Sequence, residues 1–157
     1  MDNYLLIKYL HILSAFILAG TGVGIAFFMW MATRTKNISV IVITAKHVIL
    51  ADWIFTAPAI LVQFITGSLL MEKLQYSFES PWFMSVFSLF VFVGFCWVPV
   101  IVLQYRLKKL AIEAEAIGIL GGNFYRVLKY WVALGIPAFI GILIIVWLMV
   151  FKPLDVV

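Results

Sequence analysis

Four long apolar stretches dominate the sequence, and they constrain its fold more than any other feature. They cover residues of about 5–31, 48–71, 81–105 and 129–151. A helix needs about 20 mostly apolar residues to cross a hydrocarbon core of roughly 30 Å. Backbone polar groups in lipid must be satisfied internally, and these stretches lack the alternation of barrel strands. Each stretch therefore predicts one transmembrane helix.

The composition supports the same fold class. Hydrophobic residues make up 66% of the chain and charged residues 11%, whereas soluble domains average about 45–50% and about 25%. We predict an all-α, integral membrane four-helix bundle that forms a single domain over residues 1–157. The N-terminus lacks basic residues, and its apolar run exceeds the roughly 7–15 residues of a signal-peptide core. We therefore expect the first span to be retained.

The distribution of basic residues predicts the orientation. One side of the bundle would carry eight of them, and the other side would carry Lys8, Lys73 and Lys152. The eight are Arg34, Lys36, Lys46, Arg106, Lys108, Lys109, Arg126 and Lys129. Because Lys and Arg accumulate in cytoplasmic loops, both termini are predicted to be non-cytoplasmic. The net charge of +4 is thus attributed to topology, and we expect the lipid bilayer, and no nucleic acid, as a partner.

Aromatic residues near the predicted ends of the spans are typical of the membrane interface. Trp82, Trp131 and Tyr4 occupy such positions, where interfacial belts are enriched in Trp and Tyr. The alternative is that each faces lipid at no special depth.

His11 is the most informative polar residue within the spans. It lies about 10 Å into the first helix at 1.5 Å per residue, and Gln63 lies at a similar depth in the second. Neutral imidazole is a good axial ligand for haem iron, so His11 is a candidate metal ligand with Gln63 beside it. The alternative is that His11 hydrogen-bonds Gln63 or Ser14 and so joins two helices.

A stripe of small and polar residues follows one face of the second span. It consists of Asp52, Thr56, Ala59, Gln63 and Gly67, which recur at helical spacing. Such a stripe faces the inside of the bundle. It predicts either close helix packing or the polar lining of a cofactor or quinone crevice, with Asp52 and Gln63 as cofactor-binding candidates.

His47 is the second candidate metal and cofactor ligand. It lies beside Lys46 at the cytoplasmic edge of the second span, where a histidine commonly sits among lipid headgroups. The helical rise separates it from His11 by roughly 20 Å along the membrane normal. We therefore expect that the two histidines do not bind one haem within a single subunit.

Glycines and prolines mark positions where helices approach or bend. Gly20 and Gly24 form a small-xxx-small motif, which favours close approach either inside the bundle or to a second copy. Pro58, Pro99 and Pro137 lie inside spans and predict local distortion. The single cysteine, Cys96, excludes thiolate-ligated metal clusters and an intrachain disulfide.

Several long runs resemble a bacterial family of predicted integral membrane proteins of unknown function. They extend from Tyr4 to Ala15, Gly20 to Trp30, Ala51 to Ala59, Trp131 to Phe139 and Trp147 to Pro153, together with Gln63, Thr66 and Gly67. The resemblance covers nearly the whole chain. It implies a multi-pass protein of the bacterial cytoplasmic (inner) membrane.

A more distant resemblance is to the HemJ-type membrane protoporphyrinogen IX oxidases and the CopD-like membrane proteins. The shared features are Lys8 with His11, Pro58 with Ala59, Phe124-Tyr125-Arg126 and a final Lys-Pro. This resemblance implies haem b, with His11 as a ligand. The HemJ type has a basic residue late in its first span, whereas this sequence has Phe27-Phe28-Met29-Trp30 there. This sequence also has no histidine in its third span. These departures weigh against protoporphyrinogen oxidation itself.

Three functions remain open at this point. The leading hypothesis is a haem b-binding membrane protein with a redox or electron-transfer role, which as an enzyme would be a haem-dependent oxidoreductase working with a redox partner or quinone. The second is a non-enzymatic accessory or structural subunit that binds another membrane protein through the Gly-rich first helix and the polar stripe. A homodimer through the same helix is a related expectation. The third is a small transporter centred on Asp52 and Gln63.

Overall fold

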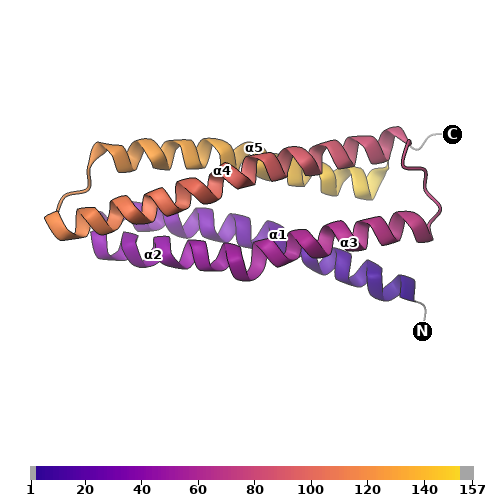
Figure 1. The fold of residues 1–157 in the computed structure, drawn as a ribbon, viewed down its shortest axis with the longest axis horizontal. Coiled ribbons are helices and arrows are strands. Elements are labelled where there is room, and N and C mark those ends of the chain that lie inside the picture. Colours follow the sequence, from indigo (N-terminus) through magenta and orange to yellow (C-terminus); the bar gives the residue numbers. More distant parts are fainter. Residues whose placement is uncertain (1–2, 153–157) are drawn as a thin grey trace.

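The computed structural model describes residues 3–152, and these residues form an all-α bundle (Figure 1). Its elements are α1 (Asn3–Arg34), α2 (Ile38–Ala51), the π-helical turn η1 (Asp52–Thr56), α3 (Ala57–Lys73), α4 (Pro81–Ile117) and α5 (Gly122–Phe151). Because α2, η1 and α3 follow one another without a break, they form a single long helix. The predicted fold of four long helices is confirmed.

Each of the four helices is long and apolar enough to cross a membrane. They extend over Asn3–Arg34, Ile38–Lys73, Pro81–Ile117 and Gly122–Phe151, so every predicted apolar stretch lies within a helix that is longer than the roughly 20 residues needed. The second helix begins at Ile38, before the predicted span, and α4 continues past the predicted third span to Ile117. The orientation in the membrane stays a prediction, and Pro153, at the predicted end of the fourth span, lies outside the described residues.

Local sequence explains where the helices begin and end. The side chains of Asn37 and Ser80 accept hydrogen bonds from backbone N–H groups in the first turns of α2 and α4, which caps them. Gly118 ends α4 with a φ of 74°, in the left-handed region that glycine adopts without strain. Asn3 and Lys152, the first and last described residues, lie at one end of the bundle, which we call the terminal end (Figure 1). The opposite end carries Arg34 and Lys36 where α1 connects to α2, and we call it the basic end.

The two halves of the bundle are packed differently. At the basic end, all four long helices contribute to one buried cluster, which includes Met29, Ile41, Leu107 and Phe124. Toward the terminal end, the helices separate into the pairs α1–α3 and α4–α5 (Figure 1). Among the described residues, no Cα atom pairing within 8 Å joins α3 to α4 or α5. The terminal half is therefore the looser half of the bundle.

A second, smaller cluster closes the terminal end. Met71, Trp82, Val86 and Leu148 are buried there together, and the Trp82 indole N–H donates to the carbonyl of Leu148 at 2.8 Å. The Lys152 ammonium donates to the Tyr76 hydroxyl at 2.5 Å and lies over the Tyr76 and Trp82 rings. These contacts fix the end of α5 against the start of α4.

The prediction that Trp82 and Trp131 form interfacial belts is wrong. Both side chains are 5% exposed, so they are enclosed by the bundle rather than in contact with headgroups. A large apolar ring fills space between helices as readily as it sits at an interface, and the sequence position does not separate the two. The exposed tryptophans are Trp30, Trp53 and Trp147.

The helix widens beside one of the prolines. Pro58 lies just after η1, where the Ala57 N–H bonds to the carbonyl of Asp52 in the wider π pattern. Since a proline ring collides with the carbonyl four residues earlier, the wide turn makes room for it. Pro99 and Pro137 lie inside continuous α-helices.

Candidate functional site

His11 is held between α1 and α3 in the looser terminal half of the bundle. Its ring Nδ1 lies 2.8 Å from the Thr66 hydroxyl, and Thr66 is 5% exposed. The His11 carbonyl accepts from the Gln63 amide at 3.1 Å and from the Ser14 hydroxyl at 3.0 Å. Gln63 and His11 therefore meet as predicted, but the side-chain partner of the ring is Thr66.

Glycine at position 67 lets the imidazole ring lie against α3. A Cβ atom added to Gly67 would lie 3.3 Å from His11 Cε1 and 3.9 Å from Nδ1, with no other atom within 4 Å. His11 Nε2 lies more than 4 Å from this position. Nε2 has no hydrogen-bond partner among the described residues and is not one of the fully enclosed polar atoms. One ring nitrogen is engaged, and the other is accessible.

Asp52 belongs to a separate polar cluster nearer the basic end. Its carboxylate accepts from the Thr56 hydroxyl at 2.7 Å and from the Gln104 amide of α4 at 2.6 Å. Asp52 is 3% exposed and Gln104 is 2% exposed. Over residues 3–152, no basic side chain forms an ion pair with Asp52. The cluster joins the second long helix to α4 by hydrogen bonds between side chains, which is a common use of polar residues in membrane helices.

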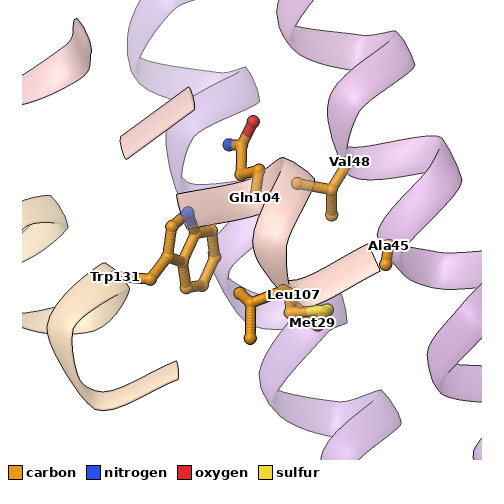
Figure 2. Close-up of a pocket in the computed structure, with 6 residues that line it drawn as sticks. All are labelled: Met29, Ala45, Val48, Gln104, Leu107 and Trp131. Atoms are coloured by element: carbon orange, nitrogen blue, oxygen red, sulfur yellow. The ribbon is translucent and has the colours of Figure 1, made fainter. Parts of the chain in front are cut away.

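A narrow void lies beside Gln104 (Figure 2). It is lined by Met29, Ala45, Val48, Gln104, Leu107 and Trp131. The Gln104 Oε1 and Trp131 Nε1 atoms are buried without hydrogen-bond partners in the described part of the chain. The void has no room for a water-sized sphere, so it does not accommodate a cofactor. We therefore interpret the Asp52 cluster as a contact that holds helices together.

The predicted site residues thus fall into distinct groups. His11 and Gln63 lie together, whereas Asp52 precedes Thr66 by 14 residues, or roughly 20 Å of helix. His47 is exposed on α2 and precedes Thr66 by 19 residues, or roughly 28 Å of helix. Among the described residues, no three His, Cys, Asp or Glu side chains gather as a metal site. Any metal bound at His11 would therefore have at most two ligands of these residue types among the described residues of one chain.

Sequence reasoning missed the roles of Thr66 and Gln104. Thr66 is three residues after Gln63 and so lies on the same helical face, but a threonine in an apolar helix usually hydrogen-bonds its own backbone. Gln104 stands next to Tyr105 and Arg106, where it is typical of the end of a span. An uncharged polar residue just inside such an end is the signal that could have identified it.

Comparison with known proteins places the chain in a family. Residues 5–153 match the model of a family described as "Predicted integral membrane protein (DUF2269)". The chain belongs to this family. The match covers all four spans and agrees with the four apolar helices of the structure. The protein is therefore a multi-pass integral membrane protein.

No curated protein matches the chain, and no solved structure matches it. The family description assigns no activity. The chemistry of the protein must therefore be argued from its own residues.

Proposed function

We propose that this member of the family is a haem b-binding protein of the bacterial cytoplasmic membrane with a redox or electron-transfer role. The observation that supports this most is that the two nitrogens of the His11 ring differ in their hydrogen bonding. One nitrogen is hydrogen-bonded to Thr66, and the other is accessible and has no partner among the described residues. Protein histidines that bind metal are held in this way, by a hydrogen bond at the nitrogen that does not bind.

Two features near His11 also support haem as the ligand. The site lies in the half of the bundle where no Cα atom of α3 comes within 8 Å of α4 or α5. Lys8 is exposed and precedes His11 by three residues, so it lies on a neighbouring part of the same face. A lysine one turn nearer the membrane surface is well placed to pair with a propionate. When bound, haem would supply one-electron chemistry.

The chain's own residues would bind and orient the haem. His11 would provide an axial nitrogen, and the Gln63 and Ser14 side chains fix the backbone at that point by bonding its carbonyl. His47 does not lie within reach of the same iron. A redox partner or a quinone would exchange electrons with the bound haem.

The visible spectrum tests this proposal. After haem-replete expression and purification in a mild detergent, the wild-type protein should show a Soret band. His11→Ala should lose it, because the axial nitrogen is gone. His47→Ala should keep it, and this variant is the matched control since it removes the other histidine of the chain. A wild-type protein without a Soret band, or a His11→Ala variant with a normal one, would contradict the proposal.

A second candidate is an accessory or structural subunit that associates through α1. A Cβ atom added to Gly20 or Gly24 would meet no atom within 4 Å, so neither glycine is needed for packing inside the bundle. A homodimer through this face would bring two helices into close approach. Gly20→Leu should then convert a dimer to a monomer in light-scattering measurements. Gly135→Leu, at an equally open glycine on α5, should leave the dimer intact, and a monomeric wild-type protein would exclude this association.

A further inference from the structure

The Thr66 hydroxyl has a single proton, and the distances around its oxygen point to the acceptor. Thr66 donates to the backbone carbonyl of Val62, four residues earlier, at 2.5 Å. Threonine side chains inside helices commonly donate to this carbonyl. The same oxygen lies 2.8 Å from His11 Nδ1. Since its only proton is committed to Val62, the oxygen faces His11 as an acceptor.

The tautomer of the imidazole follows from this arrangement. A neutral histidine carries its proton on one of two nitrogens, and the hydrogen bond at one nitrogen decides which. Because Thr66 accepts, Nδ1 must carry the proton and donate it. Nε2 is then left with its lone pair, and it has no hydrogen-bond partner among the described residues. Only an unprotonated nitrogen can bind a metal.

We infer that Thr66 is a positioning residue that sets the tautomer and direction of His11 and thereby makes Nε2 the ligand atom. This inference rests on the proposed haem function for its purpose, but the tautomer can be measured without haem. Thr66 would not touch the iron. Its effect would pass through the Nδ1 proton, in the same way that carbonyl and carboxylate partners orient metal-bound histidines in other proteins.

Nitrogen-15 NMR of the apoprotein tests the tautomer directly. The chain has two histidines, so His47→Gln leaves His11 as the only labelled imidazole. At about pH 8, above the ordinary histidine pKa of about 6.5, Nδ1 should show the shift of a protonated nitrogen and Nε2 that of an unprotonated one. The opposite assignment in this background would overturn the inference, whether or not any Thr66 variant folds.

Two variants at position 66 then separate the hydroxyl from the shape of the side chain. Thr66→Val keeps the branched shape and removes the acceptor, so the two nitrogens should move toward the averaged shifts of mixed tautomers. Haem affinity should fall about ten- to a hundredfold, as is usual when such a partner is removed. Thr66→Ser keeps the hydroxyl and should preserve both properties. An unchanged tautomer in Thr66→Val would overturn the positioning role.

The two proposals can fail separately. If the wild-type protein binds no haem but shows the Nδ1-protonated tautomer and loses it in Thr66→Val, the proposed function is wrong and the control of the tautomer by Thr66 is supported. If haem binds through His11 but the free ring is protonated at Nε2, the function is supported and the role of Thr66 is wrong.

Discussion

Phe124→Ala should lower the free energy of unfolding by about 3–5 kcal/mol, the usual cost of removing a fully buried phenylalanine. Phe124 is 1% exposed and belongs to the cluster at the basic end. It lies near the turn between α4 and α5, beyond Lys108 and Lys109, where charged residues on α4 indicate contact with water. The hydrophobic effect therefore acts on this side chain in full, whereas between helices in lipid it contributes little. Denaturant titration in detergent would measure the loss.

Tyr125→Ala provides the control for this prediction. Tyr125 is the next residue, its ring contacts the Phe124 ring edge-to-face, and it is 48% exposed. A surface substitution of this kind changes stability by roughly 0.5 kcal/mol or less. Equal losses at both positions would show that the α4–α5 turn is not packed as the structure describes.

The sequence predicts the helices well because lipid leaves few alternatives. Long apolar runs in a membrane must be helical, so all four helices could be predicted directly. The π-helical turn η1 could not be predicted in this way. Pro58 predicts a lost backbone hydrogen bond, but whether the helix kinks or widens depends on the helices packed around Asp52 and Thr56. The burial of Trp82 and Trp131 depends on packing in the same way.

The candidate site could be predicted only in part. The depth of His11 and Gln63 follows from counting residues, and the structure brings them together. The partner of the ring does not follow from counting, because Gln63 and Thr66 share one face of α3 and a small rotation decides which of them meets the imidazole. That rotation is set by close contact at Gly67, which depends on the distance between two backbones. Asp52 and Gln104 pair across helices for a similar reason.

Gly67→Val should displace the His11 ring and reduce haem affinity by about five- to a hundredfold, which corresponds to about 1–3 kcal/mol of overpacking. The first carbon of any side chain would lie 3.3 Å from His11 Cε1, and a branched side chain would add two more. Gly67→Ala should have a smaller effect, because a shift of a few tenths of an ångström relieves it. Haem titration followed at the Soret band would measure both affinities.

The displacement of the His11 ring can also be measured in the apoprotein, without haem. In the His47→Gln background, Gly67→Val should move the His11 nitrogens toward averaged shifts, since the displaced ring no longer reaches Thr66. Gly122→Val is the control, because Gly122 lies at the basic end and a Cβ atom there would meet nothing within 4 Å. If Gly67→Val leaves both haem affinity and the His11 tautomer unchanged, the ring does not lie against α3. The close approach of α1 to α3 at this glycine is thus what lets His11 Nδ1 reach the Thr66 hydroxyl.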